Sequence, residues 1–385
     1  MSRIDELIAK HCPDGVEFKR LGDIVRIKNG KDHKTLGEGD FPVYGSGGVM
    51  RYVNTYTYDK PSVLIPRKGS LGNLFYVDVP FWNVDTIFYT EINESQVVPK
   101  FLYYFLSTVG LGEMNQAGGV PSQTQSVLNE LKIPVPPLEI QREIVKVLDT
   151  FTELEAELTA ELTARKKQYN YYRDQLLSFE DGGVEWKTLG EIATIQRGAS
   201  PRPIAKYITD DIDGVPWIKI GDTSPGSKYV NGTAQKVTPA GAKMSRILGK
   251  GDFIMSNSMS FGRPYILNIE GAIHDGWASI SGFSDTLNSD YLYHYLSSNT
   301  VQNFWSGKIN SGSVSNLNAD IIKTLPVPVP SISKQEKIAA LLDKFDILTN
   351  SLTEGLPREI ELRQQQYEYY RDLLLSFPKP ESAKA

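Results

Sequence analysis

The stretch that decides the fold is Gly15–Ile24, GVEFKRLGDI, because it returns 168 residues later as Gly183–Ile192, GVEWKTLGEI. A second stretch returns in the same order, since FLYYFLS at 101–107 matches YLYHYLS at 291–297. Repetition over such a distance indicates two copies of one supersecondary unit. The chain therefore predicts two similar halves, each with a globular part followed by a helical part.

Both globular parts predict a mixed, mostly β structure. Short β-prone runs such as Ser62–Ile65 and Asp252–Met255 lie between turns rich in Gly and Pro, and short helices are expected at 99–107 and 289–297. The expected fold class is therefore α+β. The boundaries that follow are a short helix at 1–14, a first globular domain at 15–137, a central helix at 138–181, a second globular domain at 182–330, a C-terminal helix at 331–378 and a tail at 379–385.

The two helical parts carry the spacing of a coiled coil. In 138–179, apolar residues recur at two positions of a heptad. One position holds Ile144, Phe151, Leu158 and Tyr172, and the other holds Leu148, Leu162, Tyr169 and Leu176. A helix of ~42 residues would be roughly 60 Å long, which is typical of a spacer. The second helix ends alike, with QYEYYRDLLLSF at 366–377 matching QYNYYRDQLLSF at 168–179. Gly355-Leu356-Pro357 opposes a continuous helix there, so we expect a kink or break near 355–357.

Composition and charge narrow the class of protein. The 385 residues include 41 basic and 46 acidic side chains, but residues 15–133 hold 12 of each, whereas 134–181 hold 6 basic and 10 acidic. The excess of acid thus lies mostly in the central helix. No apolar run is long enough to cross a membrane and no signal peptide is recognisable, so we expect a cytoplasmic protein without membrane contact. The single Cys12 and four histidines show no metal-ligand spacing, and we expect no metal site.

No motif of an enzyme is found. There is no phosphate-binding loop of the GxxxxGK[ST] type, and Gly45–Gly48 lacks the third glycine of a dinucleotide fingerprint. His274 and Asp275 lie near Ser279, but adjacent residues rarely face one another as a catalytic triad must, so a polar turn is the better interpretation. The Asn/Asp-Pro-Pro-Tyr/Phe signature of a base methyltransferase is also missing. We therefore expect no catalytic residues and no cofactor bound by this chain.

Polar loops at matching places in both halves are the candidate functional residues. Arg and Lys suit phosphates or guanine, Asn and Gln suit adenine, and glycines let a backbone approach DNA closely. Any single loop is better explained as a solvated turn, and only the duplication brings the two interpretations level. The candidate DNA-binding residues are Lys28, Asn29, Lys31, His33, Lys34, Arg67, Lys68, Ser70, Asn73, Gln116, Ser122 and Gln123 in the first half, and Gln196, Arg197, Ser200, Arg202, Asn257, Ser258, Ser260, Arg263, Asn310, Ser311, Ser313 and Asn316 in the second.

Tyrosines near the ends of both helices are candidates for partner binding. Tyr169 and Tyr172 fall on the heptad seam, which favours the core. Tyr171 and Tyr369 fall off the seam, so they are the candidates for a protein interface, with packing between helices as the alternative.

This layout resembles the specificity subunits of type I restriction-modification systems. The resemblance covers essentially the whole chain and rests on the paired GVE-aromatic starts, the PVPx5Qx2Ix3LDxF helix entries and the YYRDxLLSF ends; the near-repeat at 155–164 is similar to the spacer repeats of one subgroup. It implies that the two helices pair antiparallel and that each domain reads one half of a bipartite double-stranded DNA site. It also implies two modification (methyltransferase) subunits, which supply S-adenosylmethionine chemistry, and restriction (motor-nuclease) subunits.

Two features of the chain depart from the family pattern, and one other function is also compatible with the sequence. The interruption near 355–357 puts a straight second helix in doubt, and the near-neutral charge of each domain implies weak DNA binding by the chain alone. The alternative function is a non-catalytic coiled-coil adaptor whose two domains bind ligands other than DNA.

Overall fold

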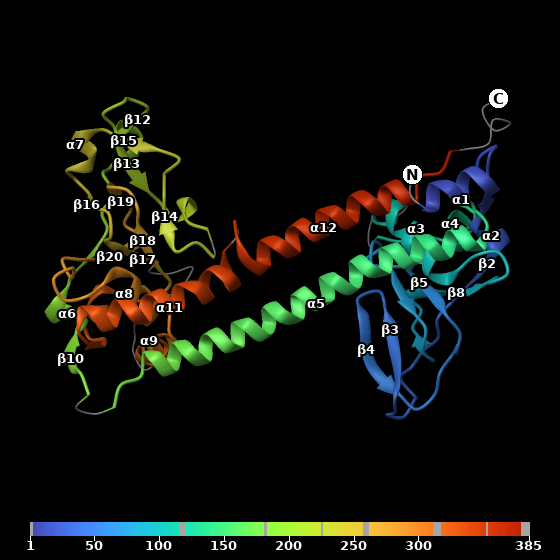
Figure 1. The fold of residues 1–385 in the computed structure, drawn as a ribbon, viewed down its shortest axis with the longest axis horizontal. Coiled ribbons are helices and arrows are strands. Elements are labelled where there is room, and N and C mark those ends of the chain that lie inside the picture. The colour runs from blue at the N-terminus through green and yellow to red at the C-terminus, as the bar shows by residue number, and fades with distance from the viewer. Residues whose placement is uncertain are drawn as a thin grey trace. The chain divides into compact units, whose positions relative to one another are not determined.

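The computed structural model describes residues 3–114, 121–180, 183–224, 226–256, 262–310, 317–351 and 353–378, with Asn310 described by its backbone alone. The expected α+β class is confirmed. The chain forms two compact units, Met1–Ala156 with Arg363–Ala385 as unit 1, and Glu157–Leu362 as unit 2. Figure 1 labels most of the elements of each.

Unit 1 is built on two small sheets. Its central sheet has the order β2-β8-β5-β6, a second sheet has the order β4-β3-β7, and β1 pairs antiparallel with β9. The strands are β1 Phe18–Arg20, β2 Val25–Lys28, β3 Phe41–Gly45, β4 Gly48–Val53, β5 Ser62–Pro66, β6 Phe75–Val77, β7 Trp82–Asn83, β8 Ile87–Ile92 and β9 Lys132–Pro134. The helices are α1 Arg3–His11, α2 Leu21–Ile24, α3 Pro99–Thr108, α4 Gln125–Asn129 and a 3-10 turn at Leu111–Glu113.

Unit 2 repeats this plan with larger sheets. Its central sheet has the order β11-β20-β17-β18-β14, a second has the order β12-β15-β13-β19-β16, and β10 pairs with β21. The strands are β10 Glu185–Thr188, β11 Thr194–Arg197, β12 Ile208–Thr209, β13 Val215–Ile218, β14 Tyr229–Val230, β15 Lys236–Val237, β16 Arg246–Leu248, β17 Phe253–Ser256, β18 Pro264–Leu267, β19 Gly271–Ile273, β20 Trp277–Ser281 and β21 Pro326–Val329. The helices are α6 Leu189–Ile192, α7 Pro239–Ala242, α8 Ser289–Leu296, α9 Asn299–Asn310 and α10 Ala319–Lys323, with 3-10 turns at Ile204–Lys206 and Ile220–Asp222.

The four strands of the central sheet of unit 1 all have counterparts in unit 2, whose sheet adds β14 at its edge. In chain order, β2, β5, β6 and β8 correspond to β11, β17, β18 and β20, and they occupy the same places in the sheet. The parallel pair β3–β7 likewise corresponds to β13–β19. The repeat seen in the sequence is therefore a repeat of topology.

The long helices are α5 Leu138–Leu176, α11 Ile332–Asn350 and α12 Gly355–Leu374. In unit 1 the first part of α5 buries Ile144 and Leu148 completely. There Phe151 stacks on Tyr370 of α12 with ring centroids 5.5 Å apart, and Glu155 accepts a hydrogen bond from Gln364. Because the partner number falls as the α5 number rises, the two helices are antiparallel in this unit.

In unit 2 the second part of α5 packs on α11. Tyr169 and Tyr172 both stack on Phe345, with centroid distances of 6.3 and 5.7 Å. Tyr169 is buried, as its heptad position predicts. Tyr172 remains 41% exposed, so its prediction as a core residue is wrong. In this unit its ring stacks on Phe345 and makes an edge-on contact with Tyr171, which is itself 62% exposed, so part of the ring stays in solvent.

The interruption of the second helix lies slightly earlier than the sequence suggested. α11 ends at Asn350, and Gly355 begins α12 with a φ of 76°, a left-handed conformation that favours glycine. A Cβ at Gly355 would lie 2.4 Å from the carbonyl oxygen of Ile347. Pro357 falls in the first turn of α12, where its missing N–H costs nothing. The proline is therefore accommodated in the first turn of the new helix, and the break precedes it.

Candidate nucleic-acid interface

The candidate loops of each unit leave the central sheet at one end. In unit 1, β2 and β5 both run antiparallel to β8, with Lys28 beside Tyr89 and Pro66 beside Ile87. The loops after β2 and β5 therefore start next to each other. In unit 2, β11 and β17 flank β20 in the same way, with Arg197 beside Ala278.

In unit 1 the second and third candidate loops contact each other, and the first lies against α4 beside them. Lys68 forms an antiparallel bridge with Ser122, and the amide of Gly69 donates to the carbonyl of Pro121 at 2.9 Å. The first loop contacts the helix that follows the third loop, because the side chain of Gln125 at the start of α4 donates to Asn29 Oδ1 at 3.3 Å. Asn73 Nδ2 donates to the carbonyl of Ser46 at 3.2 Å, which adds the β3–β4 turn to the same surface. Sequence patterns did not place this turn among the candidate loops.

The side chains on this surface differ in exposure. Asn29, Lys31, Lys34, Lys68, Ser70 and Asn73 are exposed, whereas Lys28, His33, Arg67 and Ser122 are half-buried. Within the described residues, no carboxylate lies at ion-pair distance from Lys31 or Lys68. Their positive charges are thus available to an anionic ligand such as a phosphate.

Other candidates in unit 1 have structural partners. Gln123 is 2% exposed, and its amide nitrogen donates to the carbonyl of Pro66 at 2.7 Å, which ties the third loop to the second. Lys28 pairs with Glu91 at 3.7 Å, and the guanidinium of Arg67 lies 5.8 Å from the centre of the Phe88 ring. Gln123 is therefore too buried to contact a ligand, and its role is to hold the two loops together.

A glycine in the first loop of each unit allows close backbone packing. A Cβ at Gly30 would lie 2.0 Å from the carbonyl oxygen of Val84, and one at Gly198 would lie 2.1 Å from that of His274. Val84 and His274 hold equivalent places just before β8 and β20. Since real Cβ atoms do not approach so closely, glycine is required for this packing in both units.

Asp275 organises the first loop of unit 2. Its carboxylate accepts from Ser200 Oγ at 2.9 Å and pairs with Arg202 at 3.4 Å, while its carbonyl accepts from Arg197 Nε at 3.0 Å. Burial acts to raise the pKa of Asp275, but the hydrogen bond from Ser200 and the nearby cationic groups outweigh it and lower that pKa. The ionised carboxylate thus offsets part of the positive charge of the loop. Gln196, Arg197 and Arg202 remain exposed.

His274 and Asp275 do contact each other, contrary to the expectation for adjacent residues, with His274 Nε2 3.0 Å from Asp275 Oδ1. Ser279 takes no part, because its buried hydroxyl donates to the carbonyl of Gln196. The three residues therefore hold the loop in place and do not form a triad.

Arg263 lies apart from the first loop in the part of unit 2 that is described. Its guanidinium is 5.5 Å from the centre of the Tyr265 ring, and it lines a pocket of about 290 Å³ together with Tyr169 and Arg173 of α5. The candidates Gln116, Asn257, Ser258, Ser260, Ser311, Ser313 and Asn316, and the side chain of Asn310, lie outside the described residues.

The two candidate interface tyrosines are exposed, each within its own unit. Tyr171 is 62% exposed and Tyr369 is 65% exposed. Each packs edge-on against the next tyrosine, Tyr172 or Tyr370, at about 5.5 Å. Each pair therefore presents an aromatic surface that the chain does not cover within its unit.

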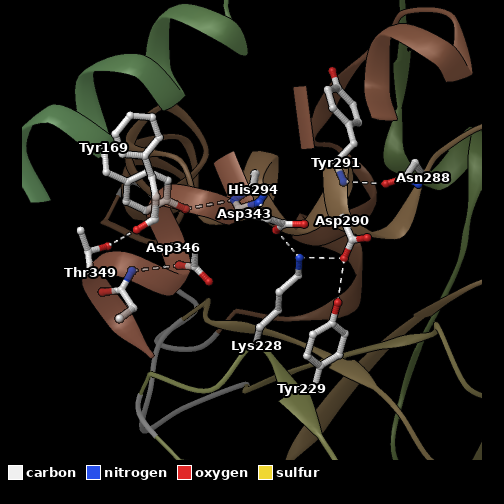
Figure 2. A network of polar contacts seen from close by, with 12 residues as sticks. Tyr169, Lys228, Tyr229, Asn288, Asp290, Tyr291, His294, Asp343, Asp346 and Thr349 are labelled. Atoms are coloured by element: carbon white, nitrogen blue, oxygen red, sulfur yellow. Dashed lines mark hydrogen bonds and ion pairs between the residues drawn. The ribbon is translucent and has the colours of Figure 1, made fainter. Parts of the chain in front are cut away.

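Sequence reasoning missed the most deeply buried polar residues of both units. Gln141 and Gln335 have no exposed surface, and Figure 2 shows a further polar network around His294 and Asp343. The available signal was their repetition, because both glutamines follow a proline segment at the same distance. Within the described residues, no group of three or more His, Cys, Asp or Glu could hold a metal, and no helix is long and apolar enough to cross a membrane.

The fold and the site together define a class of protein. It is a recognition protein with two similar domains, in which polar loops follow equivalent strands of two duplicated sheets. The sequence profile described as "Type I restriction modification DNA specificity domain" matches residues 13–164 and 182–362. The EcoR124I/EcoR124II specificity subunit of Escherichia coli is 40% identical over 99% of this chain and 98% of its own length. A putative specificity subunit of Haemophilus influenzae is 31% identical over 94% and 96%.

A solved structure shows the same fold. The S subunit of a type I system from M. genitalium superposes with a TM-score of 0.59 at 17% identity, covering 94% of this chain and 97% of its own. The chain belongs to the family of type I restriction-modification specificity subunits. As such it is the non-catalytic subunit that specifies the DNA target of a restriction-modification complex.

Proposed function

We propose that each recognition domain, 15–137 and 182–330, reads one half of a bipartite site in double-stranded DNA. The observation that carries this proposal is the matched position of the loops, which leave the same end of topologically equivalent sheets. In unit 1 these loops present unpaired lysines beside amide and hydroxyl side chains, the groups that contact phosphates and base edges. In unit 2, Gln196, Arg197 and Arg202 have the same role.

The helical parts, 138–181 and 331–378, set the distance between the half-sites and bind two modification subunits. Support comes from the exposed tyrosines Tyr171 and Tyr369, since aromatic residues are enriched at protein interfaces. S-adenosylmethionine binds to those partner subunits, and restriction subunits join the full complex. The complex acts in the cytoplasm, where its DNA and methyl donor are found.

The experiment is a methylation assay with and without the partner. The purified chain alone should transfer no methyl group, and adding its cognate modification subunit should methylate DNA at one bipartite motif, as sequencing of modified bases would show. Methyl transfer by the chain alone would contradict the proposal. Methylation without sequence preference would favour the adaptor alternative.

A further inference from the structure

A buried glutamine joins each recognition domain to the start of its long helix. Gln141 Nε2 donates to the carbonyls of Gln96 and Pro136, at 2.9 and 2.7 Å, and its Oε1 accepts from the amide of Val98 at 2.8 Å. Both N–H groups and one oxygen lone pair are therefore used. The partners lie just before α3 and just before α5, so one side chain fixes two segments of the domain against the helix.

Gln335 makes the same three bonds in unit 2. Its Nε2 donates to Thr286 and Pro330 carbonyls at 3.0 and 2.8 Å, and its Oε1 accepts from the amide of Asn288 at 2.8 Å. Backbone groups cannot turn away as side chains do, and leaving buried ones unpaired is costly. The contact therefore fits only one placement of the helix.

An aspartate eight residues further along each helix forms a second contact. In unit 1, Asp149 accepts from Tyr104 OH at 2.6 Å and pairs with Lys100 Nζ at 2.8 Å, both on α3. Tyr104 is 3% exposed. Eight residues are about 12 Å of helix, so the two contacts are well separated along its axis.

In unit 2, Asp343 occupies the equivalent place and contacts His294 Nε2 at 2.7 Å and Lys228 Nζ (Figure 2). Lys228 also pairs with Asp290 of α8 at 2.7 Å. His294 Nδ1 lies 3.0 Å from the hydroxyl of Tyr169 on α5. Burial acts to raise the pKa of Asp343, but the hydrogen bonds from His294 and Lys228 outweigh it and lower that pKa, so the ionised carboxylate accepts from Nε2 of His294. The domain is thereby bonded to α11 and to α5.

We propose that Gln141 with Asp149, and Gln335 with Asp343, are paired anchors that fix the angle of each recognition domain on its helix, and that these positioning residues thereby select the spacer length between half-sites. Apolar contacts such as those of Ile144 are non-directional and allow small rotations, whereas two hydrogen-bonded points 12 Å apart do not. This inference rests on the proposed function, because it presumes a bipartite target.

The test uses the full chain in complex with its modification subunits. The variants are Asp149→Ala, which removes the second anchor, and Tyr104→Phe, which removes one hydroxyl and keeps the packing. Glu153→Ala is the control, since it deletes an exposed carboxylate one turn further along α5. The substrate is a DNA library with the native half-sites at every spacer from two base pairs shorter to two longer, and sequencing measures methylation at each spacer.

In both anchor variants we expect the preference for the native spacer over its neighbours to fall about tenfold, the size expected for losing a hydrogen bond to a charged group. Glu153→Ala should leave that preference unchanged. An unchanged preference in folded Asp149→Ala and Tyr104→Phe, including methylation lowered equally at all spacers, would overturn the proposal. Failure of the proposed function is recognised separately, because the wild-type complex would then select no bipartite site.

Discussion

At the scale of single residues, Gly198 is the position in the candidate interface of unit 2 that leaves least room for a side chain. Replacing it with Ala places a methyl group 2.1 Å from the carbonyl oxygen of His274, so the loop must move away from β20. We expect the free energy of unfolding to fall by ~1–3 kcal/mol, as for overpacking elsewhere. Denaturant unfolding measures it, with Gly232→Ala as the control because no atom lies within 4 Å of its added Cβ. Equal stability of the two variants would contradict this packing.

Lys68 tests whether the loops of unit 1 contact DNA. In the assembled complex, Lys68→Ala should weaken binding and lower the slope of log affinity against log salt by about 1, because one phosphate contact is lost. Lys60→Ala, which removes an exposed lysine outside the candidate loops, should leave both unchanged.

In unit 2, Arg197→Ala should weaken the free energy of DNA binding by ~1–3 kcal/mol if Arg197 reads a base edge. Unchanged binding in both loop variants would show that other residues form the interface.

Residue types in these loops could be predicted from the sequence, but their partners could not. Duplicated polar loops were visible as a pattern, whereas the burial of Gln123 depends on Pro66, which is 57 residues away in the chain. The contact between Arg202 and Asp275 likewise spans 73 residues. Such pairings between loops depend on the whole fold, which no local pattern encodes.

At the scale of elements, heptad spacing predicted α5 well because a helix needs only local hydrogen bonds and one apolar seam. The break in the second helix was predicted from Gly355 and Pro357, but its position was not. Proline stops a helix only when it lies inside it, and here it lies in the first turn. Local sequence alone does not decide between these two placements.

The near-repeat in α5 leads to a prediction about length. Inserting Thr-Ala-Glu-Leu after Leu162 adds four residues, which is about 6 Å of helix and a rotation of only ~40°. Because DNA rises ~3.4 Å per base pair, the methylated motif should then contain a spacer one or two base pairs longer, with both half-sites unaltered. Deleting Thr159–Leu162 should shorten the spacer. Sequencing of the methylated motif checks both variants. An active variant with an unchanged spacer would show that α5 does not set the spacer length.

At the scale of the whole molecule, the duplication predicts modular specificity. Exchanging residues 15–133 for the same domain of another family member should change one half-site and leave the other unaltered, because the matched sheets carry separate loop sets. The methylated motif of the chimaeric complex is the measurement. A change in both half-sites would mean that the domains read DNA jointly.

The duplication itself was predictable because the repeated segments occur in the same order. What the repeat does not reveal is that unit 2 is continuous in sequence while unit 1 is assembled from both ends of the chain. Leu375 and Phe377 are buried in the core of unit 1, where Phe377 packs on Phe101 with ring centroids 6.3 Å apart. The amide of Val16 also donates to the carbonyl of Pro378.

This arrangement reverses the usual order of events on the ribosome, where the N-terminal part of a chain folds first. Unit 2 has all its residues once position 362 has been translated, whereas unit 1 also needs the segment that begins at Arg363. Unit 1 emerges earlier but waits with an open apolar surface for the last helix to close it. We therefore expect the first-made domain to keep apolar surface exposed until Leu375 and Phe377 reach its core.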